Sequence, residues 1–280
     1  MSILDKFQLS DRGALVTGCS RGRIPAPFMK PLLLTTLVLV AFAPGCTTTK
    51  SSNAATISSE PRRAVVPKLS GELKIDGRLD EPVWQRAAVL KPFFPNRGEG
   101  RDSEATEVRL WYDHTALHLG WVCTDRDIQA TLTKRDSRFW DEEVVEFFVT
   151  PGKLEQYFEL QWNPLGGVFD AIIHNQLGPD GRSQKFTGDW SYTAKGMQSA
   201  VRVDGTVGNS AEVDRGWTVE VTLPFSDLGV PAPKPGTVWR GNFYRFSRGT
   251  NNPEQQLSWS PTRLPGFHEP SRFGYLEFGR

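Results

Sequence analysis

We predict an all-β fold, an antiparallel β-sandwich of jelly-roll type with one short helix, for most of this 280-residue chain. The first observation is composition: nine Trp, 26 Gly and 20 Pro stand against only three Met, which suits a β-rich, loop-rich domain. The second is a recurrence of short segments with alternating apolar and polar residues, separated by Gly/Pro turns. The net charge of +1 provides no field strong enough to indicate nucleic acid as a partner.

The first 28 residues contain a short stretch that resembles only the beginning of a known motif. Residues 14–22 (ALVTGCSRG) resemble the first strand and glycine turn of short-chain dehydrogenases, where the backbone approaches a dinucleotide. The third glycine is missing, and Pro25 and Pro27 oppose the helix that must follow. No Tyr-x-x-x-Lys pair follows downstream either. We therefore reject dehydrogenase activity and a nucleotide cofactor, and interpret residues 1–28 as a remnant, a fusion scar or a misassigned start.

Residues 29–46 (MKPLLLTTLVLVAFAPGC) have the layout of an export signal. A lysine precedes an apolar run at 31–43, and residues 43–46 resemble a lipobox that ends in Cys46. The run is too short for a comfortable membrane span. We predict a lipoprotein signal peptide with Cys46 as the lipidated N-terminus; the alternative is an uncleaved anchor helix. The protein would then be exported and lipid-anchored to the cell envelope, on the periplasmic or outer-membrane side, or extracellular.

Residues 47–65 are small, polar and unpatterned, so we predict a flexible linker. The sandwich follows over residues 66–280. Residues 80–87 (DEPVWQRA) predict the one short helix, with Trp84 on its buried side, after a strand at 73–75 and a turn at 76–78. Further strands are expected, in chain order, at 108–112, 117–123, 144–149, 157–163, 168–174, 191–194, 200–203, 217–223, 238–246 and 273–278.

The strands at 144–149 and 157–163 predict a hairpin around the turn at Pro151–Gly152. Alternation places two sets of residues on opposite faces. The apolar face carries Val145, Phe147, Val149, Phe158, Leu160 and Trp162; the polar face carries Glu146, Tyr157, Glu159, Gln161 and Asn163. Carboxylates, amides and aromatic rings on one face predict a wall of a pocket for a polar, ring-shaped ligand.

Most tryptophans lie within strands or on the helix face and are expected in the core: Trp84, Trp111, Trp121, Trp162, Trp217 and Trp239. Trp140 and Trp259 lie at element edges beside polar residues and are candidates for ligand stacking, whereas Trp190 fits either role. Cys123 ends a core-facing alternation, so we expect a buried, inert thiol. The three cysteines are too scattered for a disulfide framework, and the four histidines match no transition-metal motif.

Seven segments, in this order, resemble the carbohydrate-binding family 9-like modules, sandwich domains found as appendages of xylanases. They are residues 75–84 (IDGRLDEPVW), 117–125 (LHLGWVCTD), 140–151 (WDEEVVEFFVTP), 157–171 (YFELQWNPLGGVFDA), 216–229 (GWTVEVTLPFSDLG), 239–247 (WRGNFYRFS) and 257–261 (LSWSP). The resemblance spans the whole of residues 66–280. It implies a sandwich that binds a saccharide without acting on it.

The resemblance also implies particular site residues. Family members hold a sugar ring between two aromatic planes while polar side chains bind its hydroxyls, and a carboxylate accepts two such bonds. Trp140 would be the first aromatic plane, Trp259 the second, and Glu146 the acidic ligand. Gln161, Asn163 and Arg245 would be further polar contacts. The family's structural calcium would be held by loop carboxylates, for which Asp125, Asp127, Asp141 and Glu142 are the candidates.

Three alternatives stay open at this point. Glu146 and Glu159 point to the same side, and two carboxylates can hydrolyse a glycosidic bond, but a glycosidase normally needs a deeper cleft and a larger scaffold, so we predict no enzyme. Related sandwiches hold b-type haem through Met with His or Lys, and Met197 is the one Met after Cys46. A structural surface lipoprotein with a decayed sugar site is the third. We predict non-catalytic binding of a xylan- or glucan-type saccharide, alongside partner glycoside hydrolases.

Overall fold

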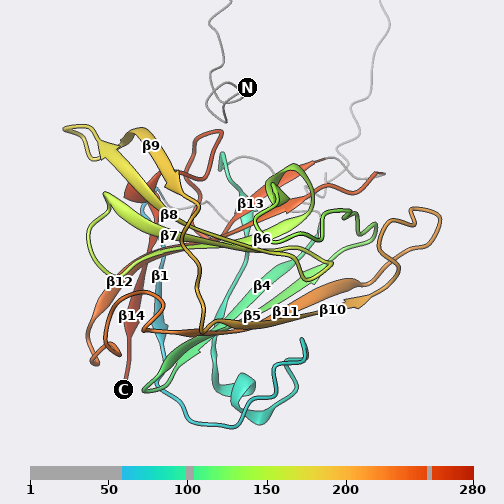
Figure 1. The fold of residues 1–280 in the computed structure, drawn as a ribbon, viewed down its shortest axis with the longest axis horizontal. Helices are drawn as coiled ribbons and strands as arrows, with labels where there is room; N and C mark the ends of the chain where they lie inside the picture. The colour runs from blue at the N-terminus through green and yellow to red at the C-terminus, as the bar shows by residue number, and fades with distance from the viewer. Residues whose placement is uncertain (1–58, 99–103, 251–253) are drawn as a thin grey trace, which may run out of the picture. The chain divides into compact units, whose positions relative to one another are not determined.

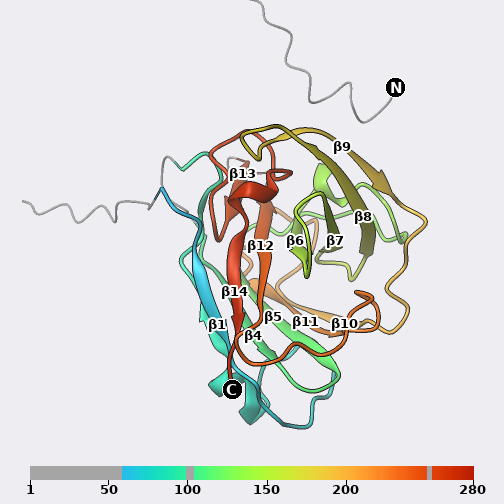
Figure 2. The same ribbon diagram turned by 90° about the vertical axis from the view of Figure 1, so that its left-hand side faces the viewer.

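Two β-sheets make up the domain in the computed structural model, which describes residues 59–98, 104–250 and 254–280. The predicted signal peptide, Cys46 and most of the predicted linker lie outside the described residues. Figures 1 and 2 show the two sheets as separate layers, with β4, β5, β11 and β10 in one and β6, β7, β8 and β12 in the other. The prediction of an all-β sandwich is confirmed.

The larger sheet has nine strands, and its main path runs β1 (Arg63–Val66), β14 (Gly274–Phe278), β12 (Val238–Ser247), β6 (Val144–Thr150), β7 (Gln156–Trp162), β8 (Val168–Leu177), β9 (Ser183–Asp189). β13 (Gln255–Ser258) pairs with β12 and with β3 (Phe94–Pro95). The five-stranded sheet runs β10 (Gln198–Asp204), β11 (Gly216–Pro224), β5 (Ala116–Thr124), β4 (Thr106–Tyr112), β2 (Ala88–Leu90). Among the named strands, only β1 and β14 pair in parallel.

The predicted short helix is a 3-10 helix, η2 (Pro82–Arg86), and it buries Trp84 as expected. Two further 3-10 helices, η3 (Phe139–Asp141) and η4 (Pro270–Arg272), occur in the described part of the chain, and no α-helix does. No helix there is long and apolar enough to cross a membrane. The strand expected at 73–75 is irregular, because the backbone N–H groups of Asp76 and Gly77 donate to the Glu220 carboxylate and bend the chain at that point.

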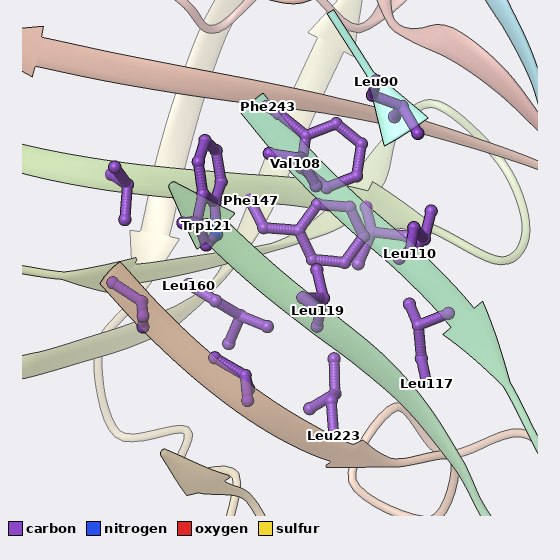
Figure 3. Close-up of a cluster of buried hydrophobic side chains, with 14 of the residues drawn as sticks. Leu90, Val108, Leu110, Leu117, Leu119, Trp121, Phe147, Leu160, Leu223 and Phe243 are labelled. Carbon is purple, nitrogen blue, oxygen red and sulfur yellow. The ribbon is translucent and has the colours of Figure 1, made fainter. Parts of the chain in front are cut away.

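The main core lies between the two sheets (Figure 3). Burying large apolar side chains there is the main stabilising term of such a fold. Residues from both sheets meet in it, among them Val108, Leu110, Leu119 and Trp121 from the five-stranded sheet and Phe147, Leu160 and Phe243 from the nine-stranded sheet. The six tryptophans predicted as core are all buried, which confirms that prediction. Cys123 is buried in the same core and forms no disulfide.

The central hairpin forms with the predicted faces. The apolar residues pair across β6 and β7 as Val145 with Trp162, Phe147 with Leu160 and Val149 with Phe158. These six residues face the core, so we call this side of the nine-stranded sheet its inner face. The opposite side is its outer face, and it carries Glu146, Glu159 and Gln161 as the alternation predicted.

The outer face is not simply exposed to solvent. A second apolar cluster lies on part of it, where Phe267 and Phe273, on either side of η4, pack against outer-face residues such as Phe148 and Tyr244. The ring of Phe267 stacks on Tyr244 at a centroid distance of 4.1 Å, and Phe273 meets Tyr157 edge-on at 5.1 Å. Polar side chains on this face are therefore buried although they point away from the main core.

Candidate functional site

One row of side chains crosses the outer face from strand to strand. The pairing register places Ser258 (β13) beside Tyr244 (β12), Tyr244 beside Glu146 (β6), Glu146 beside Gln161 (β7), and Gln161 beside Phe169 (β8). We call these five residues the outer row. With strands about 4.8 Å apart, the row spans roughly 19 Å. It gathers residues from positions 146 to 258 into one strip.

Glu146 lies in the middle of the outer row and has no protein partner for its carboxyl group. Its residue is 2% exposed, and the structure records no hydrogen bond or ion pair to this carboxyl group among the described residues. Burial raises the pKa of Glu146 well above its usual range, and the charge of Glu159 raises it further. A buried carboxyl group without a hydrogen-bond partner costs free energy, and a ligand that donates hydrogen bonds to it would offset that cost.

Glu159 lies two positions from Gln161 along β7, on the same face. Its carboxylate accepts a hydrogen bond from Gln161 Nε2 at 2.6 Å. Burial raises the pKa of Glu159 to about 8, although this hydrogen bond acts in the opposite direction. Gln161 Oε1 and Ser258 Oγ are buried without a hydrogen-bond partner. The outer row therefore holds several polar atoms whose hydrogen bonds the protein does not satisfy.

Arg248 is the cation whose charge acts on Glu146, but it is paired with another carboxylate. Its charge lowers the pKa of Glu146 only as the smallest of three influences. Its Nη1 pairs with the Glu254 carboxylate at 3.2 Å, and its guanidinium lies 4.8 Å from the centre of the Phe246 ring. Arg248 therefore does not neutralise Glu146 by direct contact.

Three aromatic rings bound the row beyond Gln161, and we call them the aromatic wall: Trp140, Phe169 and Trp190. Their centroids lie 5.3 Å (Trp140–Phe169), 5.8 Å (Trp140–Trp190) and 5.4 Å (Phe169–Trp190) apart, all edge-to-face. Trp140 is half-buried and Trp190 is 40% exposed. Gly188 permits this arrangement, because a Cβ there would lie 2.6 Å from Trp190 Nε1. The wall offers apolar surface beside the polar centre of the row.

A neutral histidine, His268, packs against Tyr157 and Phe186 on the outer face. Tyr157 Oη and His268 Nδ1 are 2.7 Å apart, and the His268 ring stacks on Phe186 at 3.9 Å. Burial lowers the pKa of His268 to about 3, so the ring is uncharged at neutral pH. This cluster supports the outer face and adds no charge to it.

Of the six predicted sugar-binding residues, the structure brings Trp140, Glu146 and Gln161 to the same region of the outer face. It places Trp259 elsewhere. Because Ser258 points outward, its neighbour Trp259 points inward, where it is 1% exposed and meets Phe243 edge-on at 5.9 Å. Trp259 therefore has no free face for a ring, and the tryptophan beside Trp140 is Trp190.

Asn163 and Arg245 also occupy folding positions. Asn163 Nδ2 donates to the Leu132 carbonyl at 2.7 Å, and its Oδ1 accepts from the Gly167 N–H at 2.7 Å, so the side chain fixes the turn before β8. Arg245 lies on the inner face and is fully buried, and its Nη2 binds Asp125 Oδ2 at 2.7 Å. Both side chains are bound to other protein groups, so the structure does not place either of them as a ligand contact, contrary to our expectation.

The sequence placed Glu159 on the polar face of the hairpin but did not indicate Tyr244 or Ser258. One signal could have found the two hydroxyl residues. Tyr244 and Ser258 are the immediate neighbours of Arg245 and Trp259, with the opposite alternation. A strand register shifted by one residue exchanges the two faces, so assigning Arg245 to the core would have placed Tyr244 in the site.

The four carboxylates suggested for calcium have separate protein partners. Asp125 binds Arg245, and Asp127 Oδ1 accepts from Gln129 Nε2 at 2.7 Å. Asp141 pairs with Arg138 at 3.0 Å, and Glu142 accepts from the Thr131 and Leu132 N–H groups at 2.8 and 3.0 Å. The described residues contain no group of three or more His, Cys, Asp or Glu that could hold a metal ion. As a set, the four do not fit a calcium site here, and calcium stays a prediction.

Met197, the methionine considered for haem, is partly buried and packs against the main core. It lies just before β10, in the five-stranded sheet, whereas the outer row lies on the nine-stranded sheet. Nothing in the outer row is suited to an iron ligand of that kind.

The fold and the outer row together define a β-sandwich binding module, with an unsatisfied polar strip beside aromatic surface. The family model for carbohydrate-binding family 9 matches residues 102–278. The chain therefore belongs to carbohydrate-binding family 9, whose modules bind and do not catalyse. No curated protein sequence matches this chain.

Solved structures show the same fold at low sequence identity. A candidate carbohydrate-binding protein from Bacteroides uniformis matches with a TM-score of 0.61 at 18% identity, covering 78% of this chain and 100% of that one. A family 9 module from Caldicellulosiruptor kristjanssonii in complex with cellotriose matches with a TM-score of 0.53 at 15% identity, covering 78% and 95%. The module from the same organism in complex with glucose gives 0.50 at 16% identity, covering 78% and 97%.

Proposed function

We propose that this chain binds a saccharide on the outer face of its nine-stranded sheet, with Trp140, Glu146 and Gln161 as the central contacts. The observation that carries the proposal is the buried carboxyl group of Glu146, which has no partner among the described residues although polar groups surround it. Sugar hydroxyls would satisfy it, since a carboxylate accepts two hydrogen bonds. The aromatic wall would pack against the C–H face of the ring.

The chemistry of the outer row fits this role better than catalysis. Glu146 and Glu159 both lie deep on one sheet face, where burial raises the pKa of each, that of Glu159 to about 8, so burial acts on both carboxyl groups in the same direction. A hydrolytic pair needs one ionised and one protonated group with space for the sugar between them. Membership of a non-catalytic family supports the same conclusion.

For the ligand class, we propose glucan- or xylan-type oligosaccharides. The two Caldicellulosiruptor kristjanssonii modules with the same fold are described with cellotriose and with glucose. In this role the module would hold a polysaccharide near partner glycoside hydrolases, which would perform the hydrolysis.

We also propose that the module is exported and tethered through a lipid on Cys46, on the strength of the signal-like residues 29–46. Mass spectrometry of the mature protein tests this directly. A diacylated Cys46 supports the tether, whereas an intact Met1 would contradict it.

Isothermal titration calorimetry with gluco-, xylo- and manno-oligosaccharides tests the main proposal. Wild type should bind at least one series, and Glu146→Gln and Trp140→Ala should each weaken that binding at least about tenfold. Glu277→Gln is the matched control, because Glu277 is an exposed glutamate on the same sheet. Absence of binding to every series would refute saccharide recognition.

The calcium prediction has a separate test. An ion held by Asp125, Asp127, Asp141 or Glu142 would stabilise the folded state, so a chelator would lower the melting temperature. An unchanged melting temperature in excess chelator would remove calcium from the description.

A further inference from the structure

The centre of the outer row is rich in hydrogen-bond acceptors and poor in donors. Glu146 brings two carboxyl oxygens to which the described residues donate no recorded hydrogen bond, and within the same residues Gln161 Oε1 is buried without a partner. Glu159 accepts one recorded hydrogen bond, from Gln161 Nε2. Because that bond commits the Gln161 amide nitrogen to Glu159, its oxygen is left as an additional acceptor. Three neighbouring side chains therefore present acceptors to the same place.

A ligand group that matches this site must bring several donors. A sugar hydroxyl has one O–H to donate, whereas a protonated amine has three N–H donors and a positive charge. Hydrogen bonds between an ammonium group and carboxylates are also stronger than those between neutral groups. The acceptors of Glu146, Glu159 and Gln161 match an ammonium group in number and in charge.

We propose that the outer row selects saccharides that carry a free, protonated amino group, the 2-amino sugars being the simplest members of this class. The inference rests on the proposed saccharide-binding function and specifies its ligand. The ammonium group would lie between Glu146 and Glu159 and donate to Gln161 Oε1, while the sugar ring extends toward the aromatic wall.

The other charged and titratable groups near the pair leave room for a cation. Arg248 is paired with Glu254, and His268 is neutral. Tyr244 Oη donates to the Phe267 carbonyl at 3.1 Å, and Tyr157 is bound to His268. The acidic pair therefore lacks a fixed counter-ion in direct contact among the described residues, and an incoming ammonium group would supply one.

Proton release would accompany binding of an amino sugar. In the unliganded site, burial raises the pKa of both Glu146 and Glu159, that of Glu159 to about 8, and the charge of Glu159 raises that of Glu146 further, so the pair holds protons more tightly than free carboxyl groups do. A bound ammonium group favours the ionised carboxylates and would expel those protons, whereas a neutral sugar would not. The number of released protons can be measured from the dependence of the binding enthalpy on the ionisation enthalpy of the buffer.

The experiment is calorimetric titration of the wild-type protein with glucose, glucosamine and N-acetylglucosamine, and with the corresponding β-1,4-linked disaccharides, at pH 6.5 in two buffers. We expect glucosamine forms to bind about tenfold or more tightly than the glucose and N-acetyl forms, with proton release for the amino sugars alone. Glu159→Gln should remove most of this preference and the proton release, while binding of the neutral sugar persists. Glu277→Gln should behave as wild type.

Each outcome separates the inference from the function on which it rests. Equal binding of glucose and glucosamine without proton release would overturn the selection for amino sugars and leave saccharide binding intact. Binding of no sugar at all would overturn both. Since proton release is measured on the wild-type protein, the inference can be refuted even if Glu159→Gln fails to fold.

Discussion

Two clusters of buried charge lie on opposite faces of the nine-stranded sheet, and they differ in how far the protein satisfies them. On the inner face, Arg245 binds Asp125 at 2.7 Å and Glu104 at 3.5 Å, and its Nη1 donates to the Thr124 carbonyl at 2.9 Å. On the outer face, Glu146 has neither a cation nor a hydrogen bond from the described residues. The charge of Arg245 is thus compensated within the fold, although its Nε and Glu143 Oε2 are buried without hydrogen-bond partners in the described part of the chain. Glu146 has no cation in direct contact there.

The comparison shows that burial and charge alone do not identify a site. Arg245 is as buried as Glu146, yet its charge is compensated, which is the usual condition for a charge inside a protein. The informative property is a buried polar group without a partner.

Removing the cation of the inner cluster should have the largest effect. Arg245→Met leaves the carboxyl groups of Asp125, Glu104 and Glu143 buried together, and we expect a loss of about 3–5 kcal/mol in the free energy of unfolding. Urea denaturation would measure it. Arg138→Met is the control, because the Arg138–Asp141 pair is exposed and should change stability by less than about 1 kcal/mol. Similar stabilities for the two variants would contradict the comparison.

Trp140 and Trp259 were both predicted to stack on the sugar, but substituting them should have different effects on stability and on binding. Trp259→Ala removes a buried ring of the main core and should lower the free energy of unfolding by about 3–5 kcal/mol. Trp140→Ala affects a half-buried ring of the aromatic wall and should cost less stability but weaken saccharide binding. Thermal unfolding and calorimetry on both variants would measure the two effects. Loss of binding in a folded Trp259→Ala protein, with Trp140→Ala unaffected, would reverse the assignment.

On the outer face, removing a buried carboxyl group should stabilise the protein. Glu146→Gln takes away one member of a buried carboxyl pair, and we expect the free energy of unfolding to rise by about 0.5–2 kcal/mol while saccharide affinity falls. This combination is characteristic of a group retained for binding. If the variant were less stable than wild type, Glu146 would have a structural partner in solution.

The smallest expected effect is a shift of stability with pH. Burial, with the neighbouring Asp125, raises the pKa of Glu143 to about 10, and burial raises that of Glu159 to about 8. The folded state therefore holds these protons more tightly than the unfolded state, so stability falls as pH rises from about 4.5 toward these values. We expect a higher melting temperature at pH 5.5 than at pH 8.5. Glu159→Gln should reduce the difference, and an unchanged profile would contradict it.

Much of the fold could be predicted because alternation is strong where one sheet face is apolar. The β6–β7 hairpin, its two faces and the core tryptophans follow from that pattern. β9 (SQKFTGD) was not predicted, because its residues are mostly exposed on both sides and show no apolar alternation. β1 was absorbed into the predicted linker, since four residues beside a polar segment give no periodic signal.

The site was harder to predict than the fold. Trp140, Glu146 and Gln161 are near one another on or beside a single hairpin, where local alternation fixes their direction. Arg245 lies on β12, and Trp259 directly follows β13. The inner face accepts an arginine as well as apolar residues there, so residue type misled the assignment of direction. Asn163 binds the Leu132 carbonyl, and Arg245 binds Asp125 and the Thr124 carbonyl, all distant in sequence, and such contacts leave no local pattern.

The parallel pairing of β1 with β14, which Figure 1 shows in blue and red, gives the first strand a protective role. β14 would be an open edge without it, and open edges invite other chains to add as extra strands. The pairing begins early, since the Tyr275 N–H donates to the Arg62 carbonyl at 2.8 Å. A shortened chain that begins after Val66 would therefore expose β14 and self-associate, whereas one that retains Arg62 would keep this edge covered.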